Sequence, residues 1–543
     1  MKILFSKTVF FVSAALLLSA CSMKRYCPEP DLKLPKKVWH DSHAELDSLA
    51  MADWEWWEIY TDTVLQKLIR KTLANNKNMQ AAISKIKQLR YGSRAALAEN
   101  LPGISLRLGG DYEETHHYQS ALNIDPEPAL RASVTWEYNL FGAQAWNNRQ
   151  ARDNYLASIE GQRALQMSLI AQVATAYFEL KSLDRQLDIV TRTIETRREN
   201  MEKNNLRFKG GLTSEIVYHQ AIVEYLNAAT LVPDIETQIA LKESTISLLA
   251  GEFPSAVERS KKPLESMQWR EIPLGLPSEL LLRRPDVRQA RTQLDAAMAR
   301  TGFYFANRFP SVRFRFEPGF ENNEWEKIFR APHLYFLGHL LVPLFSFGKN
   351  QSQFKASIEA YMQEKAAYEQ KVLSAFKEVN DAMVIYSKAV QNSTLLLNLH
   401  KAAQKYADMA ELQYINGVIS YLDVLDAQRR YLNSQLGLTR SICEEYITLV
   451  NLYKALGGGW NTELPENALT KGQLRKQEQL VKQQMHDSLQ TLPGLTPKET
   501  LQTHYREFLG KDATEKTERL IRQDFGPTTQ TAKTSKKQKK KNR

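Results

Sequence analysis

The fold is decided by two short stretches of the sequence, FKGGLTS at residues 208–214 and YINGVIS at residues 414–420. Each follows a run rich in helix-forming residues, and each contains glycine and then serine. A glycine just past a helix end supplies a left-handed turn, and a serine caps the helix that follows. Each stretch therefore predicts a tight hairpin between two helices, with Gly210, Gly211 and Gly417 in the turns.

The two hairpins repeat at a constant displacement of 206 residues (the hairpin displacement). It pairs Gly211 with Gly417, and it pairs the Tyr-Leu-Asn triplet at 225–227 with the one at 431–433. A displacement of 208 residues (the leading displacement) aligns the segments that precede the helices. Offsets that hold over whole elements indicate an internal duplication.

Proline positions predict that the first helix of each hairpin is very long. No proline occurs between residues 128 and 233 or between residues 343 and 465. Because proline costs about 3 kcal/mol inside a helix, these spans favour uninterrupted helices, which we expect at about 149–208 and 350–414. Roughly 60 residues at 1.5 Å each give a helix of about 90 Å, which is stable only when it packs on other helices.

Segments of alternating polarity precede each predicted long helix, at 104–108, 132–140 and 312–317. A period of two with aromatic residues near the ends is typical of strands in membrane barrels, but half-buried sheets of soluble proteins give the same pattern. A fourth segment, 334–344, alternates poorly and contains Pro343. Four strands cannot close a membrane barrel, which needs about eight, so a barrel requires oligomerisation.

The N-terminus predicts export and a lipid anchor. Residues 1–20 have a basic start and a short apolar run, as in a signal peptide, and Leu-Ser-Ala-Cys at 18–21 resembles a bacterial lipoprotein signal. Cys21 would then be the first mature residue and carry acyl chains; the alternative is an ordinary signal peptide with a coincidental cysteine. We expect a first repeat at 21–260, a second at 261–460 and a basic extension at 461–543.

The net charge of +11 is concentrated at the C-terminus. Residues 460–543 hold 17 basic and 10 acidic residues, which leaves +4 for residues 1–459. Since an exported chain does not meet nucleic acid, we expect no nucleic-acid partner, and the tail is a solvated segment or one that meets anionic envelope polymers. Three cysteines exclude a disulfide framework.

Three further motifs carry a family resemblance: LPSELLLRRPDVRQAR at 276–291, GVISYLDVLDAQRRYLNSQ at 417–435 and LGGGW at 456–460. With the lipoprotein signal, they resemble the TolC family of outer-membrane efflux channels, in its lipoprotein branch, sometimes called NodT-type. The resemblance covers about residues 21–460. It implies a mixed α+β membrane protein in which three chains form a 12-stranded outer-membrane β-barrel, four strands per chain, and a long periplasmic α-helical barrel.

The resemblance also implies a function. The homotrimer would be the passive outer-membrane exit duct of a tripartite efflux system, lipid-anchored and in contact with outer-membrane lipid. Its partners would be a periplasmic adaptor, or membrane fusion protein, and an inner-membrane pump, most often of the resistance-nodulation-division type. It implies no enzymatic activity and no cofactor apart from the lipid on Cys21.

Within this family the hairpin turns close the periplasmic end of the duct. Asp423 and Asp426 match the acidic positions of that aperture, and Tyr414 matches an aromatic residue near the constriction. Where the best-known gate of the family has an ion pair, this chain has Ile419 and Val217, so we predict an apolar latch that involves Ile419. The alternative is that either acid only caps or charges the first turn of the helix that begins near Ser420.

Other functions fit the sequence less well. It contains no HExxH, GxSxG or glycine-rich phosphate loop, so an enzyme is disfavoured. A periplasmic adaptor has one helical hairpin rather than two, and a structural coiled-coil lipoprotein would leave the alternating strands unexplained. His116 and His117 lie in a predicted loop whose polar cluster is more often solvated than metal-bound, so no metal site is predicted. The sequence does not indicate which compound is exported.

Overall fold

The computed structural model describes residues 23–32, 55–115, 123–263, 283–322, 324–343 and 345–460. The signal peptide, Cys21, the His116–His117 pair and the basic extension lie outside the described residues, so the predictions made for them stay predictions.

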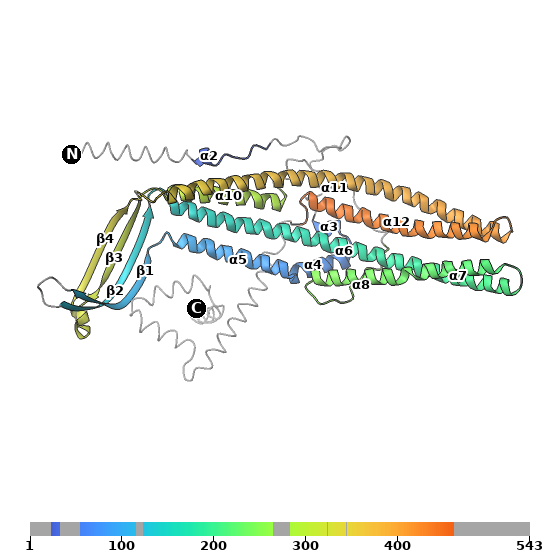
Figure 1. The fold of residues 1–543 in the computed structure, drawn as a ribbon, viewed down its shortest axis with the longest axis horizontal. Coiled ribbons are helices and arrows are strands. Elements are labelled where there is room, and N and C mark those ends of the chain that lie inside the picture. The colour runs from blue at the N-terminus through green and yellow to red at the C-terminus, as the bar shows by residue number, and fades with distance from the viewer. Residues whose placement is uncertain are drawn as a thin grey trace, which may run out of the picture. The chain divides into compact units, whose positions relative to one another are not determined.

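Two helices of 67 residues each run the length of the helical part, α6 (Ala143–Lys209) and α11 (Lys349–Ile415) (Figure 1). At 1.5 Å per residue each is about 100 Å long. The prediction of two long helices is therefore confirmed, and both exceed their expected bounds. Each follows a glycine in the left-handed region, Gly142 at φ 71° and Gly348 at φ 80°, which turns the chain sharply into the helix.

After each turn the chain returns alongside its long helix. The first return consists of α7 (Glu215–Ala229) and α8 (Leu231–Leu249), and the second is one helix, α12 (Tyr421–Ala455). The first return is interrupted at Thr230, shortly before Pro233. Proline lacks an amide hydrogen and is tolerated in the first turn of a helix, so its position accounts for a new start there.

Shorter helices flank the long ones. The N-terminal region forms α2 (Met23–Tyr26), α3 (Trp56–Ile59), α4 (Thr63–Asn75) and α5 (Lys77–Ala98), and the second half begins with α10 (Pro285–Ala306). Pro285 is at the first position of α10, where the fixed φ of proline suits the start of a helix.

Element bounds in the two halves correspond at the two displacements found in the sequence. α5 and α10 have 22 residues each, and the leading displacement carries one onto the other. α6 and α11 have 67 residues each, and they correspond at the hairpin displacement. The hairpin displacement also carries the span from the start of α7 to the end of α8 onto α12. Each residue of these helices therefore has a counterpart in the other half.

The four strands form one antiparallel sheet in the order β1-β2-β3-β4: β1 (Gly103–Thr115), β2 (Asn123–Asn139), β3 (Ser311–Glu321) and β4 (Pro332–Leu341), with a 3-10 helix η4 (Trp325–Arg330) between the last two. The strands lie at one end of the long helices, and the hairpin turns lie at the other (Figure 1). β1 and β4 are the outer strands of this sheet.

The two faces of the sheet differ in polarity. Apolar side chains stand exposed on one face, among them Ile104 at 80% and Leu106 at 73%. On the other face Arg313 pairs with Glu137 at 2.7 Å and Arg131 pairs with Glu321 at 2.7 Å. The predicted alternation is confirmed, and the polar groups of one face pair across strands.

Two strand bounds differ from the expectation. β2 begins at Asn123 and contains Pro126 and Pro128, and β4 ends at Leu341, before Pro343. Both prolines of β2 lie where it pairs with β1 but not with β3, whose pairing begins at Ala129. One side of the strand is an edge there, and an edge tolerates a missing amide hydrogen.

None of the helices within the described ranges is both long enough and apolar enough to cross a membrane.

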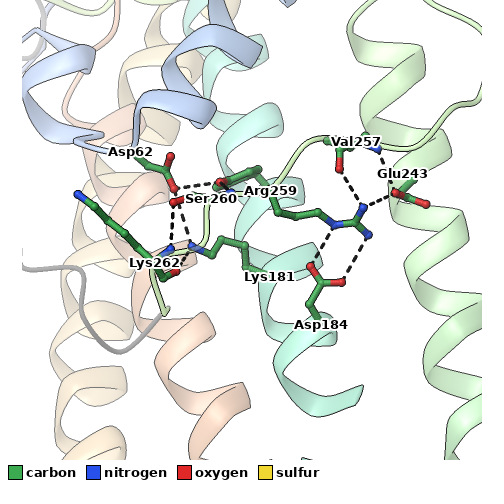
Figure 2. A network of polar contacts seen from close by, with 9 residues as sticks. Asp62, Lys181, Asp184, Glu243, Val257, Arg259, Ser260 and Lys262 are labelled. Atoms are coloured by element: carbon green, nitrogen blue, oxygen red, sulfur yellow. Dashed lines mark hydrogen bonds and ion pairs between the residues drawn. The ribbon is translucent and has the colours of Figure 1, made fainter. Parts of the chain in front are cut away.

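A partly buried polar network holds the segment after α8 against α6 (Figure 2). Lys181 donates to the carbonyl of Lys262 at 2.6 Å and lies 3.8 Å from the carboxylate of Asp62. Arg259 bridges Asp184 of α6 at 3.1 Å and Glu243 of α8 at 2.7 Å. Burial raises the pKa of Asp184, although Arg259 opposes this. The network fixes the end of the first half across the middle of the long helix.

The return helices meet the short helices end to end at two corresponding junctions. Asn76 caps α5 and donates its Nδ2 to the carbonyl of Leu249, the last residue of α8, at 2.9 Å. Its counterpart at the leading displacement, Arg284, donates Nη1 to the carbonyl of Ala455, the last residue of α12, at 3.1 Å. At each junction one side chain thus donates to a carbonyl at a helix end that would otherwise have no hydrogen-bond donor within the helix.

Candidate aperture at the hairpin turns

Both turns use a glycine in the left-handed conformation, Gly211 at φ 71° and Gly417 at φ 74°. The amide of Leu212 donates to the carbonyl of Arg207 at 2.8 Å, and that of Val418 donates to the carbonyl of Gln413 at 2.9 Å. Such bonds close a helix C-terminus in a left-handed cap. Gly210, which we expected to share this role, has φ −84°, a conformation open to any residue.

An apolar cluster joins the two hairpins next to the turns. Its buried members come from α7 and α12, and Val217, Tyr414 and Ile419 pack against them half-buried. Tyr414 and Tyr421 have ring centroids 5.5 Å apart, and the guanidinium of Arg207 lies 5.5 Å from the ring of Tyr414. The structure therefore brings Ile419 and Val217 together in apolar surroundings.

The two candidate acids have different partners. Asp423 accepts from the hydroxyl of Ser420 at 2.7 Å and from its amide at 3.0 Å, so it completes a capping box at the start of α12. Asp426 pairs with Arg430 one turn along, at 2.7 Å, with both side chains partly exposed. Of the two acids for which a capping role was left open, Asp423 is thus the one that caps α12.

Sequence reasoning missed a buried ion cluster that ties three helices together near the turns. Arg197 of α6 contacts the Glu224 carboxylate of α7 at 3.2 Å and donates to its carbonyl at 2.6 Å. Arg429 of α12 approaches the same carboxylate at 3.6 Å. Burial lowers the pKa of Arg197, with Glu224 opposing the shift. The only sequence signal was a lone acid within the apolar run of α7.

A groove of about 450 Å³ lies between α7 and α12 beside this cluster, lined by Ile216, His219, Val223, Leu422 and Leu425 among others. Its exposed surface is mostly apolar, and Glu215, Glu224 and Arg429 also line it. In the described part of the chain no group of three or more His, Cys, Asp or Glu side chains is arranged to hold a metal ion.

Comparison with known proteins identifies the family. The profile of the family described as outer membrane efflux protein matches residues 68–252 and 276–458, most of the described chain. The chain belongs to this family. The resemblance to TolC-like outer-membrane efflux channels is therefore confirmed, and the protein is an outer-membrane exit duct of an efflux system.

Curated relatives match over nearly their full length. The solvent efflux pump outer membrane protein SrpC of Pseudomonas putida is 30% identical over 476 residues, covering 82% of this chain and 97% of the relative. The cation efflux system protein CusC of Escherichia coli (strain K12) is 26% identical over 450 residues, covering 82% of this chain and 98% of the relative. Neither comparison supports the alternatives of an adaptor or a structural lipoprotein.

Solved structures share the fold. A membrane protein from Pseudomonas aeruginosa has a TM-score of 0.74 at 25% identity, covering 79% of this chain and 98% of the other. The open state of the Neisseria gonorrhoeae MtrE outer membrane channel has a TM-score of 0.72 at 24% identity, covering 80% of this chain and 97% of the other.

Proposed function

We propose that three copies of this internally duplicated chain form a passive, non-enzymatic duct, with twelve strands closing a barrel in the outer membrane and the helices enclosing a periplasmic tunnel. The observation that carries this proposal is the sheet, with its exposed apolar face and its opposite face of paired charges. Its outer strands β1 and β4 support closure by further copies, because a free strand edge is a ready site for pairing with another chain.

Helix length supports a periplasmic tunnel. About 100 Å is more than three times the roughly 30 Å thickness of a bilayer core. The hairpin turns would therefore lie far from the membrane that holds the sheet, at the end of the duct that faces the inner membrane.

The partners that we propose are a periplasmic adaptor and an inner-membrane pump of the resistance-nodulation-division type. Exposed apolar side chains at the turns support docking there, namely Leu212 at 73%, Ile216 at 68% and Val418 at 70%. The relatives carry names of efflux pumps for solvents and for cations. Since such different cargoes share one duct fold, we expect the pump to select the cargo.

A lipid on Cys21 is the one covalent group that we propose, and no other cofactor. The nearby described segment supports it. Tyr26 packs edge-on against Phe354 at 5.1 Å and near Phe305 at 6.1 Å, at the ends of α11 and α10 that adjoin the sheet. A chain of five residues spans about 18 Å at most, so a lipid on Cys21 is compatible with the position of Tyr26 beside the sheet. An intact mass of the purified protein without added acyl chains would contradict the anchor.

Conductance tests the proposed duct. Purified mature protein in a planar bilayer should give discrete conductance steps, and a folded trimer without them would contradict the proposal. Leu106→Arg should weaken insertion, because a cation on a lipid-facing strand position costs about 2–4 kcal/mol at the bilayer midplane and less toward its edges. Ser105→Arg is the matched control on the adjacent, polar-face position, and it should still insert and conduct.

A further inference from the structure

The C-terminal extension lies beyond the part of the chain that the efflux family shares. The family profile ends at residue 458, whereas the extension occupies residues 461–543. The proposed duct therefore does not account for it. The charge pattern of the extension and the place where it leaves the helices indicate a separate role.

Positive charge within the extension is confined to its last 13 residues. Residues 461–530 (the balanced stretch) hold 10 basic and 10 acidic side chains, so their formal charge is zero. Residues 531–543 (the basic run) hold six lysines, one arginine and no acid, which gives +7. A dense block of like charge is typical of a segment that interacts with an oppositely charged partner.

Trp460 fixes the start of the extension against α6 and α10. It follows the end of α12 at Ala455 by five residues. The guanidiniums of Arg163 on α6 and Arg288 on α10 each lie 5.2 Å from the centroid of the Trp460 ring, within the range of a cation–π contact. Both guanidiniums also donate to the carboxylate of Glu160, at 2.8 Å and 2.7 Å, and Glu160 is only 7% exposed. A buried acid thus holds the two cations that contact Trp460.

The extension therefore starts part-way along the helical part, where α12 ends beside α6 (Figure 1). Arg163 lies 20 residues after Ala143, the end of α6 nearest the sheet, and 46 residues before Lys209, the end nearest the turns. At 1.5 Å per residue these separations are about 30 Å and about 70 Å. With the sheet in the outer membrane, the starting point lies several Debye lengths of about 8 Å from that membrane.

The composition of the basic run favours a polymer over a membrane surface. Segments that bind membrane surfaces usually combine basic residues with large apolar side chains that enter the lipid. The basic run contains no apolar residue larger than Ala532. The periplasm also contains the cell wall, whose peptidoglycan carries many carboxylates on its stem peptides. A repeated array of carboxylates can pair with seven cations without any apolar contact.

We propose that the basic run binds carboxylates of peptidoglycan and thereby attaches the duct to the cell wall. This inference rests on the proposed periplasmic position of the helices. A single exposed ion pair is weak, because water and salt screen it. Seven cations on one chain bind a polymer together, since the first contact raises the effective concentration of the others. Because this binding has no apolar component, it depends strongly on salt.

Cosedimentation with purified cell wall tests the attachment. The full-length protein is held in nanodiscs of phosphatidylcholine, a lipid without net charge, and mixed with peptidoglycan sacculi. Most of it should sediment in about 0.1 M salt and stay in solution in about 1 M salt, where the Debye length falls from about 10 Å to about 3 Å. Amidation of the sacculus carboxylates should abolish sedimentation. Failure to sediment at low salt, or sedimentation that survives amidation, would overturn the proposal.

A triple variant locates the contact in the basic run. Lys539→Gln/Lys540→Gln/Lys541→Gln removes three of its seven cations. It should weaken binding to sacculi by at least about tenfold, because each cation near an anionic surface adds to the attraction. Unchanged binding by this variant would overturn the proposal.

A second triple variant is the matched control for net charge. Lys471→Gln/Arg475→Gln/Lys476→Gln also removes three cations, but from the balanced stretch. It should sediment with sacculi like the unchanged protein. A loss as large as that of the first variant would show that the overall charge of the chain attracts the wall, which would overturn the role of the basic run.

Vesicles distinguish the wall from lipid as the partner. At an equal concentration of negative charge, vesicles of phosphatidylglycerol should bind the nanodisc-held protein more weakly than sacculi do. Tighter binding to the vesicles, weakened by the substitutions at residues 539–541, would overturn the wall as partner and assign the basic run to anionic lipid.

Conductance in planar bilayers separates this proposal from that of the duct. Both triple variants should conduct like the unchanged protein, because the substituted residues lie outside the family profile. An unchanged protein that conducts but does not bind sacculi overturns the attachment and leaves the duct intact. One that binds sacculi but does not conduct supports the attachment and overturns the duct. Protein that does neither, although circular dichroism shows intact helices, overturns both.

Discussion

Three glycines in similar sequence surroundings differ in their backbone conformation. Gly211 and Gly417 have positive φ values of 71° and 74°, whereas Gly210 has φ −84°. A Cβ at Gly211 or Gly417 would meet no atom within 4 Å, so any penalty there comes from conformation and not from a clash. A left-handed conformation costs a residue with a Cβ about 1–2 kcal/mol.

Gly417→Ala and Gly211→Ala should each destabilise their turn by about 1 kcal/mol. That loss should speed amide hydrogen exchange in the last turn of α11 or α6 roughly fivefold, since such amides exchange through local opening. Hydrogen exchange followed by mass spectrometry measures this. Gly210→Ala is the matched control and should leave exchange unchanged, and equal acceleration by all three substitutions would contradict the argument.

Residue patterns alone predicted some of these roles and not others. The Ser420-x-x-Asp423 spacing is a capping signature that the sequence displays, so the cap could have been assigned before the structure. The burial of Glu224 could not, because its partners Arg197 and Arg429 come from helices that are far apart in the sequence. Only the packing of three helices decides which charged residue faces inward.

At the scale of elements, the junction of α10, α11 and α12 is held by a buried ion network. Arg284 is only 3% exposed and contacts Asp286 at 2.8 Å and Glu378 at 2.6 Å, and Lys371 contacts Asp286 at 2.8 Å. Burial opposes the charge on Asp286, but the hydrogen bonds from Arg284 and Lys371 outweigh it and hold the pKa of that carboxyl well below its usual value.

Asp286→Asn should therefore destabilise the helical part by on the order of 3 kcal/mol at neutral pH, because it leaves a buried cation with fewer partners. A lowered pKa gives stability that is present above the unfolded value of about 3.9 and is lost as the pH falls below it. The difference between the two proteins should be constant from about pH 8 to 5 and shrink below about pH 4. Denaturant unfolding followed by circular dichroism measures it.

Asp381→Asn is the control for this prediction, since Asp381 pairs with Lys377 in an exposed position on α11. Its unfolding should match that of the unchanged protein at every pH. A penalty for Asp286→Asn that is as large at pH 3.5 as at pH 7 would contradict the assigned role of the carboxylate.

The main elements could be predicted because their causes are local. The absence of proline from two long spans predicted two unbroken helices. The glycines and serines after these spans predicted the turns, so the sequence predicted both hairpins. The split between α7 and α8 at Thr230 was not expected, because a proline near a helix start and one that ends a helix look alike in the sequence. β2 exceeded its expected bounds because pairing with β1 extends it past two prolines.

At the scale of the whole molecule, assembly decides which surfaces face water, lipid or the duct. The sequence predicts oligomerisation because four strands per chain are too few to close a membrane barrel. A single chain cannot show which residues of its neighbour it contacts. The aperture depends on the same arrangement, because Asp423, Asp426, Tyr414 and Ile419 would form a constriction only when three sets of hairpins surround one axis.

Cation selectivity tests the acids at this aperture. Three copies of Asp423 and Asp426 around a narrow axis should attract cations. In water, a carboxylate about 4 Å from a cation lowers the energy of the cation by about 1 kcal/mol, which raises its local concentration roughly fivefold. In planar bilayers with a salt gradient, Asp423→Asn/Asp426→Asn should move the reversal potential toward zero. Asparagine is chosen because its side-chain oxygen can still accept the hydrogen bond from the amide of Ser420, so the start of α12 is preserved.

Glu215→Gln is the matched control, since it removes an exposed acid from the first turn of α7 at the same end of the helices. It should leave the reversal potential nearly unchanged, because the prediction assigns the selectivity to the turn of the second hairpin. An unchanged potential for the double Asp variant, with single-channel currents of normal size, would show that the acids serve only α12, Asp423 as its cap and Asp426 as the partner of Arg430. The constriction would then depend on the apolar contacts of Ile419.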